Sequence, residues 1–177
     1  MSSPCQHSME LHSYSNELRR QEEFCDVVIK VQDQRFPCHR IMLASAVKYF
    51  RNMFTQNYSE TVKKEIELKG FNAEDFELLL THIYGGSVDL NDNNAYRLLR
   101  ISHYLNLKSL EDSCTEYLLH SDSIPLNTAI CIFLFACRIG GTPLVDEFTK
   151  RMAENFVGLS KNEKFLRISG AELQRIL

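Results

Sequence analysis

The spacing of apolar residues changes along the chain, and it predicts short strands near the amino terminus followed by helices. Val27, Ile29 and Val31 occupy every second position, which is the period of a strand with one buried face. Two further strands are expected at residues 35–38 and 65–68. In the last of them, apolar residues alternate with glutamates. The pattern therefore predicts a small sheet of three strands.

The segment before the first strand carries an apolar stripe of its own. Leu11, Tyr14 and Leu18 recur at helical spacing, which predicts an amphipathic helix over residues 9–22, after a disordered start at residues 1–8. A helix of this length is marginal alone in water and needs a surface to dock on. That surface is either its own domain or a second copy of the chain, and the pattern leaves both open.

Apolar residues at helical spacing occur before and after the third strand, and signals for helix starts and ends flank them. The stripe before that strand is predicted to break near Ser45. After the strand, Asn72 is expected to cap a helix that Gly85-Gly86 ends, and a second helix follows Asp92–Asn94. Ser109 begins an S-x-x-D pattern typical of a third start. The core-facing residues predicted for these helices are Leu43, Val47, Phe50, Phe54, Phe76, Leu79, Leu80, Ile83, Ala95, Leu98, Leu99, Ser102, Leu105, Leu110, Cys114, Tyr117 and Leu118.

Strands followed by helical hairpins are typical of an α+β domain, which we place at residues 9–121. The best boundary candidate is Ser121–Pro125, and residues 122–177 are predicted to be entirely helical. In that part, Asn127 is expected to cap one helix, and Thr142-Pro143 places proline at the start of the next.

Two S-x-x-E patterns, at Ser160/Glu163 and Ser169/Glu172, predict further helix starts. The chain stops at Leu177, barely two turns into the last of these helices. So short a helix gains too little hydrogen bonding to repay nucleation. We therefore expect the full protein to continue beyond Leu177.

Composition narrows the function classes. The 177 residues carry a net charge of −3 without a basic cluster, which argues against direct nucleic-acid binding. The longest apolar run, Ala129–Cys137, is too short to cross a membrane. The six cysteines form no CxxC pair, so we expect reduced thiols, no metal site and a cytosolic or nuclear location.

No arrangement of residues points to catalysis, and we predict that the chain is not an enzyme and needs no cofactor. Asp26 and His39 could form a catalytic pair, but we expect His39 to satisfy backbone groups and Asp26 to order the domain or its dimer interface. Cys38 lies beside His39 and Arg40, which could lower its pKa and favour redox sensing. The alternative is a buried cysteine at the end of a strand.

A set of short motifs resembles the BTB (POZ) fold over roughly residues 9–120. Each motif is weak alone, and together they are specific: Cys25-Asp26-Val27, Cys38-His39-Arg40, Leu43-Ala44-Ser45, Tyr49-Phe50, Met53-Phe54 and Ile83-Tyr84-Gly85. The remaining helices, with Ala153-Glu154-Asn155-Phe156, resemble the start of a BACK domain. A BTB followed by a BACK is the arrangement of Kelch-like proteins.

The resemblance implies a homodimeric substrate adaptor of a cullin-3 RING ubiquitin ligase. In that family a hydrophobic-x-Glu motif and a helical pair called the 3-box bind the cullin, and a further domain binds the substrate. The cullin-binding positions it implies here are Phe54, Tyr58, Glu60, Tyr84, Ile130, Phe133 and Leu134. The dimerisation positions are Leu11, Tyr14, Leu18 and Asp26.

Two departures from the family pattern concern the proposed contacts. Tyr84-Gly85-Gly86 stands where the family usually has Tyr-Thr-Gly, and Pro125-Leu126-Asn127-Thr128 stands where the 3-box often has Pro-Ser-Asn-Cys. Tyr58-Ser59-Glu60 could also be a solvated loop. Two other functions stay open: a BTB transcriptional repressor that recruits corepressors, and a cytoskeletal scaffold without cullin binding.

Overall fold

A computed structural model describes residues 4–55, 64–160, 162–163, 165, 169–174 and 176. The chain divides into two compact units. The first comprises Met1–Asp89 and Arg97–Asp112, and the second comprises Leu90–Tyr96 and Ser113–Leu177. The domain boundary expected at Ser121–Pro125 stays a prediction. No helix among the described residues combines the length and apolar character needed to span a membrane.

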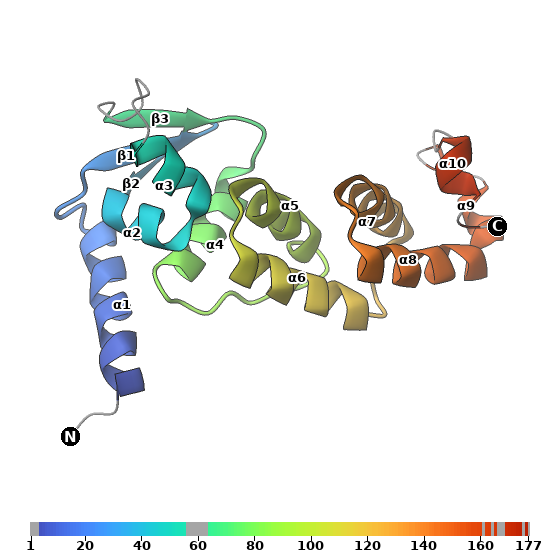
Figure 1. The fold of residues 1–177 in the computed structure, drawn as a ribbon, viewed down its shortest axis with the longest axis horizontal. Helices are drawn as coiled ribbons and strands as arrows, with labels where there is room; N and C mark the ends of the chain where they lie inside the picture. The colour runs from blue at the N-terminus through green and yellow to red at the C-terminus, as the bar shows by residue number, and fades with distance from the viewer. Residues whose placement is uncertain are drawn as a thin grey trace. The chain divides into compact units, whose positions relative to one another are not determined.

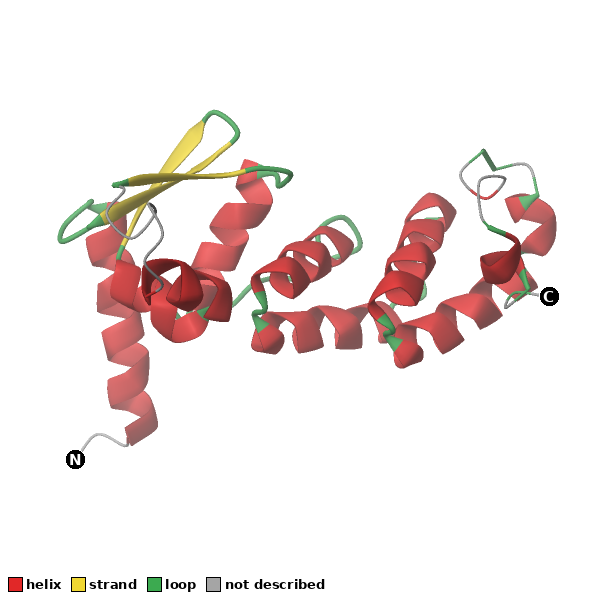
Figure 2. Cartoon of the chain, turned by 45° about the horizontal axis from the view of Figure 1, so that its top comes forward, coloured by secondary structure: helices red, strands yellow, loops and turns green. Residues whose placement is uncertain are grey.

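The predicted three-stranded sheet is present in the first unit (Figure 1). β1 (Val27–Val31) is central, pairing antiparallel with β2 (Gln34–Cys38) and parallel with β3 (Glu65–Leu68). Ile29 faces Phe36 on one side and Ile66 on the other, and alternate residues of the strands are buried. Figure 2 shows the helices of this unit on one side of the sheet.

The sequence predicts a turn between β1 and β2 at Asp33-Gln34, and the structure has it one residue earlier. It is formed by Gln32 and Asp33, because Gln32 adopts the left-handed conformation (φ +55°) that a two-residue hairpin needs. The Gln32 side chain also accepts a hydrogen bond from the backbone N–H of Ala73, at 3.1 Å. The hairpin is thereby joined to the start of α4 (Ala73–Ile83).

The helical stripe after β2 breaks at Val47, two residues beyond the predicted Ser45. α2 (Arg40–Ala46) and α3 (Lys48–Thr55) meet at Val47, whose backbone is extended. Ser45 lies inside α2, and its hydroxyl donates hydrogen bonds to the carbonyls of Ile41 and Met42. Val47 itself is buried, so the break keeps its side chain in the core.

Both predicted ends of α4 are confirmed. The Asn72 side chain accepts a hydrogen bond from the backbone N–H of Glu74 at 2.9 Å, which caps the helix. At the other end, Gly85 has φ +78°, and the N–H of Gly86 donates to the carbonyl of Thr81 at 2.8 Å. A left-handed residue of this kind is the usual end of a helix and favours glycine.

α5 (Ala95–Leu105) and α6 (Lys108–His120) follow. All five inward-facing residues predicted for α5 are buried, as are Leu110, Cys114 and Leu118 of α6. The predicted start of α6 is wrong, because the helix begins at Lys108 and Ser109 is already inside it. The Ser109 hydroxyl instead lies 2.9 Å from Nε2 of His82.

The first helix is longer than predicted. α1 runs from Pro4 to Arg20, so most of the stretch expected to be disordered is helical. Proline is tolerated in the first turn of a helix, because the N–H that it lacks would be unpaired there anyway. Its amino-terminal half extends beyond the rest of the first unit in Figure 1.

The described elements of the second unit are helical. α7 (Leu126–Ile139) ends at Gly140, which is left-handed (φ +69°), and α8 (Thr142–Glu154) has Pro143 in its first turn, as predicted. α9 (Phe156–Leu159) and α10 (Gly170–Leu173) follow. The capping box of Ser169 and Glu172 is confirmed.

The predicted cap of α7 is wrong. Asn127 lies inside the helix, and Pro125 holds the cap position without a side-chain hydrogen bond. Asn127 has a different role in the second unit, because its side-chain oxygen accepts a hydrogen bond from Asn162 at 2.6 Å.

Candidate functional site

A buried hydrogen-bond hub joins the end of β2 to the end of α4. The Tyr84 hydroxyl accepts from the backbone N–H of His39 at 3.0 Å and lies 2.9 Å from Nδ1 of the same residue. Nε2 of His39 lies 2.9 Å from the carbonyl of Glu23, to which it donates. These partners assign the proton of a neutral His39 to Nε2 and make the Tyr84 hydroxyl the donor to Nδ1. His39 therefore serves the structure, as the sequence favoured.

Tyr84 was predicted to line a partner surface, and the structure corrects this. Its side chain is 1% exposed, and burial raises the pKa of its phenol. The ring lies under the guanidinium of Arg19, whose Cζ is 5.5 Å from the ring centroid. A ring so enclosed cannot fill a pocket on another protein, so Tyr84 belongs to the core.

The suggested pairing of Asp26 with His39 is replaced by a helix cap. Asp26 Oδ1 accepts a hydrogen bond from the backbone N–H of Arg40 at 2.7 Å, at the first residue of α2. A carboxylate at this end satisfies a free N–H and suits the helix dipole. Asp26 therefore orders the β1–α2 junction, one of the two roles expected for it.

The redox alternative for Cys38 is wrong, and the buried alternative is confirmed. Cys38 is fully buried at the end of β2, and desolvation raises the pKa of its thiol. Burial likewise raises the pKa of the neighbouring Cys25 thiol. The thiolate, which is the reactive form, is therefore disfavoured at both positions.

Five residues of the first unit form an aromatic row, a chain of ring contacts: Phe54, Phe50, Tyr49, Tyr104 and Phe71. Phe54 stacks on Phe50 with centroids 5.9 Å apart, and Phe50 meets Tyr49 at 5.5 Å. Tyr104 then lies 5.6 Å from Tyr49 and 5.1 Å from Phe71. Tyr104 is 57% exposed, so the row reaches the surface.

The family resemblance implied Phe54 as a contact residue, whereas the sequence did not single out Tyr104. Tyr104 precedes the buried Leu105 and lies outside the apolar face of α5, where an aromatic side chain gives no signal of burial. Phe54 is half-buried, with the Arg40 guanidinium 4.7 Å from its ring centroid. Tyr58 and Glu60 lie outside the described residues.

α1 docks on its own unit chiefly through polar residues. Arg19 is buried and makes two hydrogen bonds with the carboxylate of Glu77, at 2.6 and 3.2 Å. His12 lies so close to Gly85 that a Cβ there would be 2.5 Å from the Cβ of His12. Because Gly85 has no side chain, it makes room for α1 at His12.

The apolar stripe of α1 is only partly covered by this docking. Tyr14 is 64% exposed and Leu18 is half-buried. The stripe also includes Leu11, whose side chain is not among those that the structure describes. Docking on its own unit therefore leaves Tyr14 uncovered, and the role of the stripe in dimerisation stays a prediction.

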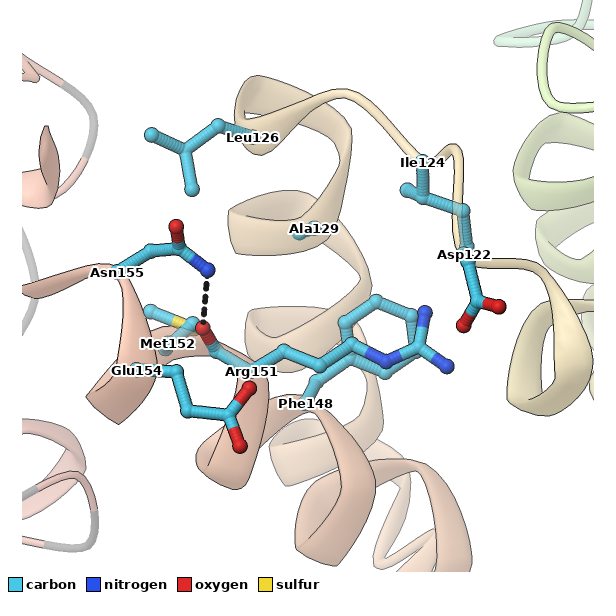
Figure 3. Close-up of a pocket in the computed structure, with 9 residues that line it drawn as sticks. All are labelled: Asp122, Ile124, Leu126, Ala129, Phe148, Arg151, Met152, Glu154 and Asn155. Atoms are coloured by element: carbon cyan, nitrogen blue, oxygen red, sulfur yellow. Dashed lines mark hydrogen bonds between the residues drawn. The ribbon is translucent and has the colours of Figure 1, made fainter.

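A groove lies between the start of α7 and the end of α8 (Figure 3). It has a volume of about 390 Å³. Its lining residues are Asp122, Ile124, Leu126, Ala129, Phe148, Arg151, Met152, Glu154 and Asn155. Apolar side chains alternate with charged ones of both signs, and Figure 3 shows Arg151 extending past Phe148 toward Asp122. Such a lining suits a protein segment with apolar and polar side chains.

The groove is lined by different residues from those predicted. Ile130 and Phe133 are fully buried and belong to the core of the second unit, which corrects their assignment as contacts. Leu134 is half-buried. α7 has an apolar residue at nearly every position from 129 to 137, so the sequence could not show which side of the helix stays accessible.

A carboxylate node fixes the segment before α7. Asp92 accepts hydrogen bonds from the hydroxyls of Tyr117 at 2.9 Å, Ser121 at 2.7 Å and Ser123 at 2.5 Å. The bonds from Ser123, Ser121 and Tyr117 hold the pKa of the Asp92 carboxyl below its usual range. In the described part of the chain, no cluster of histidine, cysteine and carboxylate side chains could hold a metal ion.

Comparison with known proteins identifies the family. The model of the BTB/POZ domain matches residues 15–122, so the chain belongs to the BTB/POZ domain family. The BTB domain of zebrafish PATZ1 has the same fold, with a TM-score of 0.60 and 24% identity over 68% of this chain and 98% of that one. Domains of this family mediate protein–protein interaction and dimerisation.

Several of the similar curated proteins are Kelch-repeat and Kelch-like proteins. Human Kelch repeat and BTB domain-containing protein 12 is 28% identical over 92% of this chain and 26% of its own length. Kelch repeat and BTB domain-containing protein 8 of Xenopus tropicalis is 33% identical over 86% of this chain and 25% of its own. Human Kelch-like protein 28 is 29% identical over 97% of this chain and 30% of its own length. The chain thus spans between a quarter and a third of these relatives.

The Arg19–Glu77 contact predicts how firmly α1 is held. Arg19→Ala should lower the free energy of unfolding by about 1–2 kcal/mol, a value reduced from that of a fully buried pair because Glu77 is partly exposed. Urea unfolding measures this, and amide exchange in α1 should rise. Arg20→Ala, at the exposed neighbouring position, is the control. Equal effects of the two changes would contradict the docking contact.

The depressed pKa of Asp92 predicts a pH dependence of stability. Because the folded pKa lies below the unfolded value of about 3.9, the stabilisation is complete above the unfolded pKa and is lost as pH falls through the folded one. The stability difference between the wild type and Asp92→Asn should be constant from about pH 7 to 5 and shrink below about pH 4. Urea unfolding at each pH tests this, with exposed Asp146→Asn as control. A difference that persists undiminished at about pH 2.5 would refute it.

Proposed function

We propose that this chain is the BTB and partial BACK portion of a Kelch-like substrate adaptor for a cullin-3 ubiquitin ligase. The observation that carries the proposal is the aromatic row of the BTB unit, which ends in the exposed ring of Tyr104. Membership of the BTB/POZ family and similarity to Kelch-like proteins along nearly the whole chain support it.

The aromatic row has the chemistry of a protein-docking surface. The Tyr104 ring contacts both Tyr49 and Phe71, so the exposed ring is held in place and loses little freedom on binding. Tyrosine combines a large apolar area with a hydroxyl, and anchors of this kind dominate the energy of many interfaces. Phe54, at the other end of the row, is the last aromatic residue before the segment that contains Tyr58 and Glu60. Our proposed cullin-binding surface consists of Tyr104, Phe54, Tyr58 and Glu60.

The groove between α7 and α8 is proposed as the second cullin contact. It occupies the place where the Kelch-like resemblance puts the 3-box. Ile124, Leu126 and Ala129 offer apolar contacts, while Asp122 and Arg151 offer charges of both signs. A single extended or helical segment of the cullin could make both the apolar and the charged contacts. Of the contacts expected from the sequence, only Leu134 keeps partial exposure on α7.

The dimer is proposed to form through the stripe of α1. The polar side of this helix, with Arg19 and His12, is held by its own unit, whereas Tyr14 is exposed. A second copy with the same stripe would cover it in a twofold arrangement, which is the commonest symmetry of homodimers. Leu11, Leu18 and Asp26 stay predicted participants.

Such an adaptor would act by proximity and not by its own chemistry. Two cullin-bound arms would bring a ubiquitin-conjugating enzyme near a substrate that a domain outside this chain captures. The gain is an effective concentration of acceptor lysines near the enzyme. We place this work in the cytosol or the nucleus, as the cysteine content suggests.

Tyr104→Ala should weaken binding to the cullin-3 amino-terminal domain at least tenfold, or about 1.4 kcal/mol, because it removes the exposed anchor. Isothermal titration calorimetry measures the affinity. Phe24→Ala is the matched control, since Phe24 is an exposed aromatic residue outside the row.

Tyr58→Ala with Glu60→Ala, in the same titration, should also weaken binding at least tenfold, or about 1.4 kcal/mol. Wild-type affinity in both variants would exclude this surface.

Tyr14→Glu should convert the dimer to a monomer, because two charges would be buried at a twofold contact. Multi-angle light scattering over a concentration series measures the mass. Ser13→Glu places the same charge on an exposed position beside the stripe and should leave the dimer intact. A wild-type chain that is monomeric at all concentrations would contradict the proposed dimer.

A further inference from the structure

The wall of the α7–α8 groove is formed by an irregular segment that depends on distant residues. Asp122 and Ile124 line the groove from the stretch between α6 and α7. Irregular backbone lacks the internal hydrogen bonds of a helix, so its position depends on side-chain anchors. Ser121 and Ser123 flank Asp122 in sequence, and both bind Asp92.

The same stretch is held from the side of α8 as well. Arg151 Nη1 donates to the carbonyl of Ser121 at 2.5 Å, and Nη2 donates to the carbonyl of Leu119 at 2.8 Å. Its Nε donates to Glu147 at 2.6 Å, which fixes the guanidinium. Ser121 is thus bound through its hydroxyl to Asp92 and through its carbonyl to Arg151.

We infer that Asp92 is a positioning residue for this groove, setting the place of Asp122 and Ile124 through the hydroxyls of Ser121 and Ser123. This inference rests on the proposed use of the groove for partner binding. Asp92 does not line the groove, so its influence on a ligand passes through the segment that it anchors.

The chemistry of the node suits this role. A carboxylate accepts several hydrogen bonds at once, and bonds to an ionised acceptor are roughly twice as strong as neutral ones. Tyr117 donates a third hydrogen bond to Asp92 from within α6, so the anchor is tied to a regular element as well as to the segment. Replacing Asp92 by alanine leaves three hydroxyls without their shared acceptor. The two serine hydroxyls can turn to water, and the backbone between them is then free to shift.

Calorimetry of the 177-residue chain with the cullin-3 amino-terminal domain tests the inference. Asp92→Ala should weaken binding about threefold to tenfold, because a loosened supporting contact displaces the residues that touch the ligand. Ser123→Ala should have a smaller effect, and Ser123→Thr should restore affinity by restoring the hydroxyl. Asp146→Asn, an equal change of charge at an exposed position of α8, is the control.

A double-mutant cycle separates positioning from general destabilisation. Ile124→Ser removes a groove contact directly, and in that background Asp92→Ala should cause little further loss, because both changes act on the same wall. Two outcomes would overturn the inference. In the first, the losses of affinity caused by the two substitutions multiply in the double variant. In the second, Ile124→Ser weakens binding while Asp92→Ala keeps the full affinity of the wild type.

Amide hydrogen exchange gives a result that does not depend on the partner. In Ser123→Ala and Asp92→Asn, exchange at residues 122–124 should rise while the buried parts of α7 and α8 keep their protection. Unchanged exchange at these residues would overturn the positioning role. A wild-type chain that fails to bind the cullin domain, with exchange altered as expected, would reject the proposed function and keep the role of Asp92.

Discussion

The first unit depends on the single hydroxyl of Tyr84. It satisfies the backbone N–H of His39, at the point where β2 turns into α2, and bonds to the His39 ring. The His39 ring in turn binds the carbonyl of Glu23, just before β1. A buried N–H without a partner costs more free energy than an average hydrogen bond gains. The end of β2, the start of α2 and the segment before β1 are therefore held together by one hydrogen-bond network.

The surface proposed on α1 follows from this arrangement. With Tyr84 at the end of α4, Gly85 comes next, and its missing side chain lets α1 approach at His12. α1 is held by its polar side, which leaves Tyr14 exposed. On α3 and α5, by contrast, ring contacts hold Tyr104 at the surface. One aromatic residue is thus exposed on each proposed surface of this unit, and each is backed by a rigid element.

The sequence predicted most of the fold and less of the candidate site. Alternation in β1, the Asn72 cap and the glycines after α4 are local signals, and each was confirmed. The start of α6 was missed because a serine pattern at Ser109 matches a cap equally well inside a helix. Exposure could not be predicted for Tyr84, Ile130 or Phe133, because an apolar residue in a core and one at an interface look alike in sequence. Tyr104 was overlooked for the converse reason, since it interrupts no pattern.

The role of Tyr84 is tested most directly by Tyr84→Phe, which removes one oxygen atom and keeps the ring. Two readings are needed, the free energy of unfolding in urea and the affinity of the folded protein for the cullin-3 amino-terminal domain. If the Tyr84 hydroxyl acts as an internal hydrogen-bond partner of His39, the free energy of unfolding falls by about 1–3 kcal/mol. The affinity at low temperature then stays within about twofold of the wild type. Unchanged stability with lost affinity would contradict the account and return Tyr84 to the binding surface.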